Sequence, residues 1–178
     1  MLPIVQVGDP VLRAIARPIA PADLAGLAEL IREMRDTMRD APGVGLAAPQ
    51  IGQSLALAVI EDAPELHAGL TPEQLAARER AAVPFHVIVN PRLEPLGDER
   101  VVAYEGCLSF KGFVMMVPRY RSVRVEALDE HGTPRVIEAT GWYARILQHE
   151  IDHLNGIVCC DRMDPRTLST TENHGRFG

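Results

Sequence analysis

The chain has 178 residues, a hydrophobic fraction of 47% and a formal net charge of −6. This length suffices for one domain with a substantial core, and the acidic balance argues against a sequence-independent nucleic-acid surface, which needs concentrated Lys and Arg. No apolar run is long enough to span a bilayer, and the first residues lack a signal or transit pattern. We therefore expect a soluble cytoplasmic protein, or a mature organellar form, with no membrane partner and no direct nucleic-acid specificity.

The first predicted elements are helical. Asp9 can cap a short turn that has Pro10 at its first position. Residues 21–43 then carry Leu, Ile and Met at helical spacing, with Arg and Asp on the opposite side. This stretch predicts an N-terminal amphipathic helix that ends at Pro42-Gly43, and we expect its methionines in the core rather than at a cofactor.

Short strand-like runs dominate the middle of the chain. Their connections are of turn length, and the DEHG sequence at 129–132 is typical of a hairpin turn, so the pattern predicts antiparallel sheets. A surface insertion with a capping box at Thr71 separates the first two runs. The runs lie at residues 55–61, 85–90, 99–105, 113–118, 122–128 and 135–139.

The last long element is a second helix. Thr140 can cap it and Gly156 can end it, and its apolar residues predict that it is buried. We expect an α+β fold in which antiparallel β-sheets pack around this central helix. The tail after Met163 is polar and has little to bury, so we expect one catalytic domain at 1–163 and a loosely held extension at 164–178.

The buried helix carries the sequence HEIDH. His149 and His153 lie four residues apart, so both rings can reach one metal ion from the same helix face, and Glu150 can touch a metal-bound water without being a ligand. The alternative is a solvated helix face with no metal. Buried imidazole and carboxylate groups need partners, which favours a metal site in the interior.

A catalytic metal usually has three protein ligands and one open position, so a third ligand is needed. Two cysteines are candidates. Cys159 follows His153 at the spacing that metzincin peptidases use for their third histidine, but it lies in an apolar run where cysteine usually acts as a small hydrophobe. Cys107 lies beside Gly106 at the end of a strand-like run. The three cysteines of the chain imply no disulfide framework.

A third stretch, APGVGLAAPQIG at residues 41–52, is rich in Gly and Ala around Gln50. It lacks the features of a nucleotide-binding loop. It can be a plain helix stop that leads into a strand. Alternatively, its small residues let a substrate backbone approach closely while the Gln50 amide donates a hydrogen bond to an oxyanion.

The stretches GVGLAAPQ, EGCLS and QHEIDHLNG together resemble the three signature motifs of the peptide deformylases, in the same order and at comparable spacing. The resemblance extends over nearly the whole chain. After EGCLS the segment FKGFVMMVPRY lacks the usual proline and is closer to the mitochondrial-type branch, as is GWYARILQHE. The resemblance implies an enzyme that removes the N-terminal formyl group from formyl-methionyl nascent polypeptides and releases formate.

The resemblance also implies a role for each matching residue. Metal ligands would be Cys107, His149 and His153, with a water in the fourth position. Glu150 would be the general acid and base, and Gln50 with the backbone N–H of Leu108 would stabilise the oxyanion. Gly45 would pair with substrate backbone. From helical spacing rather than from the resemblance, we expect Trp142, together with Val44 and Glu105, to line the pocket for the methionine side chain.

Two further residues have structural interpretations. Trp142 lies two helical turns before His149 on the same face, and a plain core position is an equal alternative to the methionine pocket. Asp152 faces away from the metal stripe, and we expect it to pair with Arg119 and so tie the helix to a strand. His67, His86, His131 and His174 lie outside any ligand spacing.

Ligand type alone allows zinc, iron, nickel or cobalt, whereas the resemblance implies Fe²⁺ in cells, with Zn²⁺, Ni²⁺ or Co²⁺ as substitutes. Fe²⁺ beside a thiolate is exposed to oxidation of both. The ribosome near its exit tunnel is a further candidate partner. Two rival functions are a zinc peptidase that uses Cys159 as the third ligand and a non-enzymatic module with a structural metal.

Overall fold

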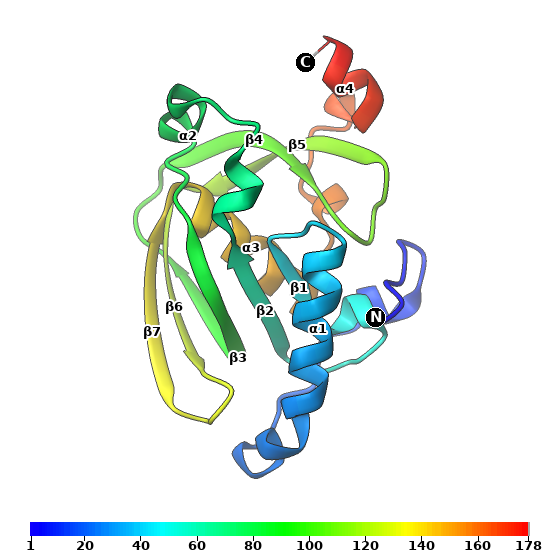
Figure 1. The fold of residues 1–178 in the computed structure, drawn as a ribbon, viewed down its shortest axis with the longest axis vertical. Helices are drawn as coiled ribbons and strands as arrows, with labels where there is room; N and C mark the ends of the chain where they lie inside the picture. Colours follow the sequence, from blue (N-terminus) through cyan, green and yellow to red (C-terminus); the bar gives the residue numbers. More distant parts are fainter. Residues whose placement is uncertain (178) are drawn as a thin grey trace.

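A computed structural model describes residues 1–177 (Figure 1). The helices are α1 (Ala28–Asp40), α2 (Pro72–Ala77), α3 (Gly141–Leu154) and α4 (Thr171–Phe177). The strands are β1 (Gly45–Ala47), β2 (Leu57–Asp62), β3 (Val83–Pro95), β4 (Arg100–Gly106), β5 (Phe113–Tyr120), β6 (Ser122–Leu128), β7 (Pro134–Thr140) and β8 (Ser169–Thr170). All strand pairs within the sheets are antiparallel, which confirms the α+β prediction.

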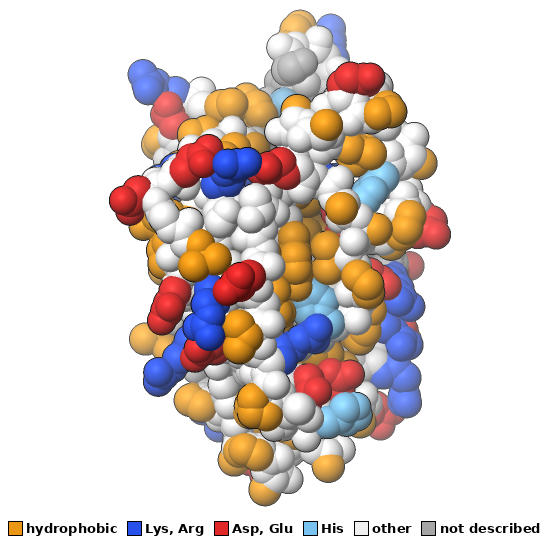
Figure 2. All heavy atoms as spheres, turned by 90° about the vertical axis from the view of Figure 1, so that its left-hand side faces the viewer, with side chains coloured by type: hydrophobic (Ala, Val, Ile, Leu, Met, Phe, Trp, Pro, Cys, Tyr) orange, Lys and Arg blue, Asp and Glu red, His pale blue; other side chains and the backbone are white. Residues whose placement is uncertain are grey.

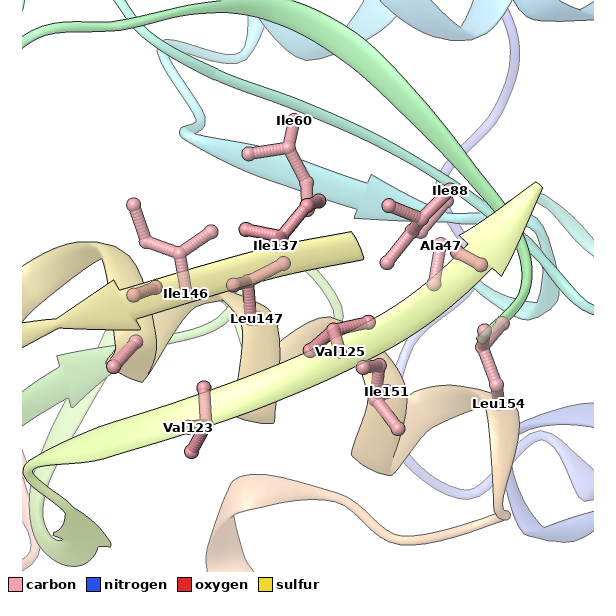
Figure 3. Close-up of a cluster of buried hydrophobic side chains, with 14 of the residues drawn as sticks. Ala47, Ile60, Ile88, Val123, Val125, Ile137, Ile146, Leu147, Ile151 and Leu154 are labelled. Carbon is pink, nitrogen blue, oxygen red and sulfur yellow. The ribbon is translucent and has the colours of Figure 1, made fainter. Parts of the chain in front are cut away.

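The larger sheet has the order β1-β2-β3-β6-β7, and α3 packs against one of its faces. Because side chains alternate along a strand, β2 points Ala58 and Ile60 toward α3. The helix contributes Ile146, Leu147 and Ile151 to the same cluster (Figure 3). Burial of each large aliphatic side chain contributes about 1.5–3 kcal/mol, so this cluster fixes the helix firmly on the sheet.

The opposite face of the same sheet carries α1. Leu57 and Val59, the alternate residues of β2, lie in this second cluster together with Met34 and Met38 of α1. Both methionines are fully buried, which confirms that the amphipathic helix packs through them. The helix begins later than predicted, because residues Pro21–Leu27 form the 3-10 helix η2.

The smaller sheet has the order β4-β5-β8 and meets α3 through β5. Its strand β8 pairs Ser169 with Val114, and the hydroxyl of Thr167 accepts a hydrogen bond from the Met116 backbone N–H. His174 of α4 stacks on Tyr104 at 4.1 Å between ring centroids. Residues 164–177 are therefore attached to the sheet, which differs from the loosely held tail that the polar composition suggested.

The ends of α3 are set by backbone geometry. Thr140 is extended and precedes the helix, but its hydroxyl lies 2.9 Å from that of Ser122 and does not cap the helix. Gly156 has φ +72°, and a Cβ there would lie 2.5 Å from the Arg13 carbonyl oxygen. Glycine is therefore required both by the left-handed backbone and by the close approach of the N-terminal segment.

Acidic and basic side chains are interspersed on the face shown in Figure 2, with no broad basic field. This mixture is consistent with the net charge of −6. Among residues 1–177, no helix is both long and apolar enough to cross a membrane.

Candidate metal centre and active site

Three potential metal ligands converge from two parts of the fold. His149 and His153 project from α3, and Cys107 immediately follows β4. One ligand atom from each residue lies within 4.8 Å of the others. The Cys107 Sγ is 3.3 Å from the His153 Nε2, and the two imidazole rings meet edge to face at 5.0 Å between centroids. This is a compact N₂S set, with one thiol and two imidazoles.

Glu105 fixes the ring of His149. Its Oε2 lies 3.0 Å from His149 Nδ1, while Arg119 donates to both carboxylate oxygens at 2.9 and 3.0 Å and Arg145 donates to Oε1 at 2.7 Å. Burial opposes ionisation of Glu105, but the hydrogen bonds from His149 and Arg119 outweigh it and hold the pKa of this carboxyl far below its usual range. A carboxylate on Nδ1 directs Nε2 of His149 toward a metal.

The same carboxylate changes the titration of the histidine. Burial lowers the pKa of His149, but the hydrogen bond and charge of Glu105 exceed that effect and raise this pKa to about 9. Burial and the nearby His149 lower the pKa of His153, which keeps its ring neutral. One imidazole thus holds a proton that a cation can replace, and the other is ready to bind a metal.

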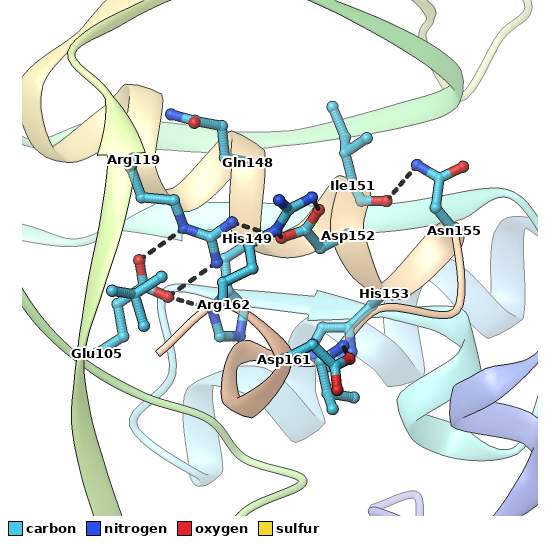
Figure 4. A network of polar contacts seen from close by, with 12 residues as sticks. Glu105, Arg119, Gln148, His149, Ile151, Asp152, His153, Asn155, Asp161 and Arg162 are labelled. Carbon is cyan, nitrogen blue, oxygen red and sulfur yellow. Dashed lines mark hydrogen bonds and ion pairs between the residues drawn. The ribbon is translucent and has the colours of Figure 1, made fainter. Parts of the chain in front are cut away.

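Arg119 extends this network to the far side of α3 (Figure 4). Its Nη1 donates to Asp152 Oδ2, which confirms the predicted pair between the helix and a strand. Arg162 also binds Asp152, through Nε at 2.6 Å and Nη2 at 2.7 Å. Arg119 and Asp152 are both buried, so the pair locks α3 onto β5 through charges that have little contact with water.

Glu150 lies in a tighter space. It is 3% exposed, and its Oε2 has no hydrogen-bond partner. Burial raises the pKa of Glu150 to about 7, so the side chain can gain and lose a proton near neutral pH. A Cβ on Gly45 would lie 2.3 Å from Glu150 Oε1, so a side chain there would displace this carboxylate from its position.

Gln50 is oriented by its own segment, the 3-10 helix η3 (Ala48–Ile51) that follows β1. The Ala47 backbone N–H donates to its Oε1 at 2.8 Å, which turns the amide nitrogen toward the ligand cluster. That Nε2 lies 3.6 Å from Cys107 Sγ and 3.3 Å from the hydroxyl of Ser109. The Gln50 amide is therefore held as a donor beside the three potential metal ligands.

The residues fit a divalent transition metal. The neighbouring Cys159 thiol and burial both raise the pKa of the Cys107 thiol well above its usual value, so its thiolate needs a nearby cation. The ligand set is a thiol and two imidazoles, with an unbonded carboxylate oxygen of Glu150 close by. Thiolate and imidazole suit zinc, iron, nickel and cobalt and do not suit magnesium or calcium.

A cavity of about 940 Å³ opens beside this cluster. All four residues that the sequence assigned to substrate binding, and five of the six assigned to catalysis or metal binding, line this cavity; His153 is the one that does not. Arg78 and Arg80 approach the Trp142 ring at 5.5 and 5.2 Å from its centroid. The lining includes Val44, Gly45, Gln50, Glu105, Cys107, Leu108, Trp142, His149 and Glu150.

Cys159, the alternative third ligand, lies outside the ligand group. It is 2% exposed and packs with Met115 and Val117 in an apolar cluster, as expected for a small hydrophobe. Sequence reasoning missed Arg145, and it missed the contact between Glu105 and His149. The only available signal was a charged residue within the apolar run ARIL, which is a weak indication of a buried ion pair.

The fold and the site are those of a metal-dependent hydrolase. A family profile described as polypeptide deformylase matches residues 1–169. Peptide deformylase 3 of Streptomyces avermitilis is 49% identical over 173 residues, which cover 96% of this chain and 75% of that protein. The chain belongs to the polypeptide deformylase family, whose members remove the N-formyl group from nascent polypeptides.

Two further relatives support this membership. The mitochondrial peptide deformylase of Homo sapiens is 42% identical over 166 residues, 92% of this chain and 68% of that protein. The crystal structure of a class I type b peptide deformylase from Acinetobacter baumannii, with Met-Ala-Ser bound, matches with a TM-score of 0.80 at 31% identity. That match covers 92% of this chain and 98% of the other.

Proposed function

We propose that Cys107, His149 and His153 hold one divalent metal ion at the wall of the cavity, where the formyl end of a formyl-methionyl peptide is hydrolysed. The observation that carries this proposal is the convergence of three ligand atoms within 4.8 Å beside a buried carboxylate with a free oxygen. When bound, the ion would supply water activation and polarise the formyl carbonyl.

Glu150 moves the protons in this proposal. As a carboxylate it accepts a proton from the attacking water, and it then donates that proton to the amine that leaves as the C–N bond breaks. A pKa of about 7 suits both steps, because the group spends comparable time in each protonation state near neutral pH. Gly45 supports this role by leaving space for the carboxylate.

Gln50 and the backbone N–H of Leu108 stabilise the oxyanion that develops on the formyl oxygen. The Gln50 amide needs no reorientation for this task, because Ala47 already holds its oxygen. Prearranged donors lower a barrier more effectively than donors that must turn during the reaction. Leu108 directly follows the ligand Cys107 in the chain, so its N–H lies next to the metal site by connectivity.

The peptide chain binds along β1. This strand is at the edge of its sheet, so its outer side can pair with an extended substrate backbone at Gly45. Val44 and Trp142 in the cavity wall contact the methionine side chain. Glu105 shares that wall, and its carboxylate acts mainly on His149 because its oxygens are already bonded. The Met-Ala-Ser complex of the Acinetobacter relative supports a peptide in this position.

The native metal in this proposal is Fe²⁺, with Ni²⁺, Co²⁺ or Zn²⁺ as substitutes. The test is formate release from formyl-Met-Ala-Ser by protein that is purified without oxygen and loaded in parallel with each ion. We expect the iron and nickel forms to be more active than the zinc form. Full activity in the presence of a chelator that removes all metal would overturn the metal assignment, and equal activity of all forms would overturn the choice of iron.

We also infer that the protein works close to ribosomes, in the bacterial cytoplasm or in an organelle, because its substrate is the formylated end of a chain under synthesis. Cosedimentation with translating ribosomes that carry a formylated nascent chain tests this inference. Recovery in the ribosomal pellet that exceeds recovery with vacant ribosomes is the expected result, and equal recovery with both would contradict it.

A further inference from the structure

A second cavity lies on a different side of α3 from the three potential metal ligands. Its volume is about 510 Å³, and no residue lines both this cavity and the one beside those ligands. Strands β3, β4 and β5 supply most of its remaining wall. The helix contributes residues at intervals of three and four, which lie together on one helix face. These residues are Gln148, Ile151, Asp152 and Asn155.

Arginine dominates the polar lining of this second cavity. Four arginines and one aspartate line it, a formal excess of three positive charges in a chain whose net charge is −6. The arginines are Arg92, Arg100, Arg119 and Arg162. A local excess of this kind runs against the acidic balance of the whole chain, and it attracts negatively charged ligands to the cavity.

Two of these guanidinium groups have no acidic partner. Among residues 1–177, no carboxylate oxygen lies within 4.0 Å of a side-chain nitrogen of Arg92 or Arg100. Glu126, which stands opposite Arg92 on β6, binds Arg124 instead. Arg100 lies over the ring of Tyr120 at 4.0 Å from its centroid. Stacking uses the flat face of a guanidinium, so the N–H groups of Arg100 remain available to a ligand.

The other two guanidinium groups are held by acids. Arg119 is 3% exposed and donates to Glu105 and Asp152. Arg162 donates to Asp152 through Nε and Nη2, so its Nη1 remains available (Figure 4). Both oxygens of Asp152 already accept hydrogen bonds, which leaves this carboxylate little capacity to bind another cation. The cavity therefore offers N–H donors from three arginines beside a fixed, buried positive charge.

We propose that this cavity binds a phosphate monoester, whose phosphate accepts hydrogen bonds from Arg92, Arg100 and Arg162. Guanidinium groups match the paired oxygens of phosphate, and the nearly double charge of a monoester suits the positive excess better than a single carboxylate. The volume lies within the range of small-molecule sites. The organic part of the ligand would lie against the apolar wall. This wall consists of Pro91, Leu93, Pro118 and Ile151.

Isothermal titration calorimetry of the zinc-loaded full-length chain at low salt tests the proposal. The probes are adenosine monophosphate, inorganic phosphate, adenosine, acetate and a short single-stranded RNA without terminal phosphates. The variants are Arg92→Ala and Arg100→Ala. Arg17→Ala is the matched control, because Arg17 is also exposed and has no acidic partner but lines neither cavity. Circular dichroism verifies the fold, and a glutamine variant replaces any alanine variant that does not fold.

We expect one saturable site for adenosine monophosphate, weaker binding of inorganic phosphate, and no binding of adenosine or acetate. Arg92→Ala and Arg100→Ala should each weaken the binding of adenosine monophosphate by about 10- to 100-fold, because each removes hydrogen bonds between charged groups. Arg17→Ala should bind like wild type. Equal weakening in all three variants, or no saturable binding in wild type, would overturn the site.

The remaining probes test the choice of ligand. Acetate that binds as tightly as phosphate would overturn the choice of phosphate. Inorganic phosphate that binds as tightly as adenosine monophosphate would overturn the role of the apolar wall. RNA that binds more tightly than adenosine monophosphate would assign the cavity to a nucleic-acid backbone and overturn the choice of a monoester.

Phosphate can also bind a metal ion, so the titration is repeated after removal of zinc. We expect the same affinity, because no residue of this cavity belongs to the proposed ligand set. Binding that disappears with the metal would place the probe on the ion and overturn the inference. None of these measurements uses a formyl peptide, so failure of the phosphate site is distinguishable from failure of the proposed hydrolysis.

Discussion

The helix α3 presents two polar regions that differ in how fully their atoms are bonded. Glu105, Arg119 and Asp152 form an ion-pair network. Among residues 1–177, every buried side-chain nitrogen and oxygen of this network has a hydrogen-bond partner. In the metal pocket, one oxygen of Glu150 and one nitrogen of His153 have none. The bonded network fixes the position of the helix, whereas the pocket retains bonding capacity for water, substrate and metal.

The strongest test of this contrast is Glu150→Gln, which removes the charge and keeps the size of the side chain. General acid and base catalysis contributes about 10²–10⁴ in rate, so kcat should fall by that factor. Metal content should stay unchanged, because Glu150 lies outside the proposed ligand set. Formate release and metal analysis on the same sample measure both quantities. Full loss of metal in this variant would show that Glu150 belongs to the ligand set.

The second test acts on the bonded network. Arg119→Ala leaves Glu105 and Asp152 buried with too little positive charge, and breaking a buried pair costs about 3–5 kcal/mol. Chemical denaturation measures this loss. Arg121→Ala is the control, because Arg121 is exposed and its ion pairs with Glu79 and Glu99 lie at the surface. Similar stability of the two variants would mean that the network does not fix α3.

Gln50→Ala tests the oxyanion donor. Loss of one such donor typically reduces kcat by about 10²–10³, and it should leave KM and metal content close to wild type. Gln53→Ala is a matched control, because Gln53 is the same residue type, lies three positions later and is exposed. If the two variants have the same kcat, the Gln50 amide does not act in the transition state.

The smallest expected effect comes from Glu105→Gln, which weakens the support of His149. Loss of such a partner typically costs about 10–100-fold in metal affinity. The pH dependence adds a second readout. Metal must displace the proton of His149 below its pKa of about 9 as well as the thiol proton of Cys107, so affinity in the wild type should rise more steeply with pH below that value than above it.

Without the Glu105 charge, the pKa of His149 is lower, and metal competes with the His149 proton over a smaller range of pH. The steep part of the rise in affinity should therefore end at a lower pH in Glu105→Gln than in wild type, while the part due to the Cys107 thiol continues in both. Equilibrium dialysis with zinc over a pH series measures both curves. Curves whose slopes change at the same pH would show that Glu105 does not control this titration.

The elements that the sequence predicted well are those whose signal is local. The periodicity of α1 and α3, the hairpin turn between β6 and β7, and the capping box at Thr71 each depend on residues a few positions apart. Strands β1 and β8 were missed, because they are only three and two residues long and exist through pairing with distant partners.

The site residues show the same division between local sequence signals and contacts between distant positions. The histidine pair and Gln50 belong to compact motifs, so their positions followed from the sequence and from the resemblance. The bond from His149 to Glu105 spans 44 positions, and that from Arg145 to Glu105 spans 40. No local sequence pattern predicts such contacts. Glu105 was therefore assigned to the methionine pocket, and its actual bonding partners became clear only in three dimensions.

The absence of a side chain at Gly45 links two segments that are far apart in sequence. Any larger residue there would meet the carboxylate at position 150, so that side chain would have to leave its present position. A methyl group at position 45 would therefore act on the reaction through the acid on the helix, even though the strand around it is only three residues long.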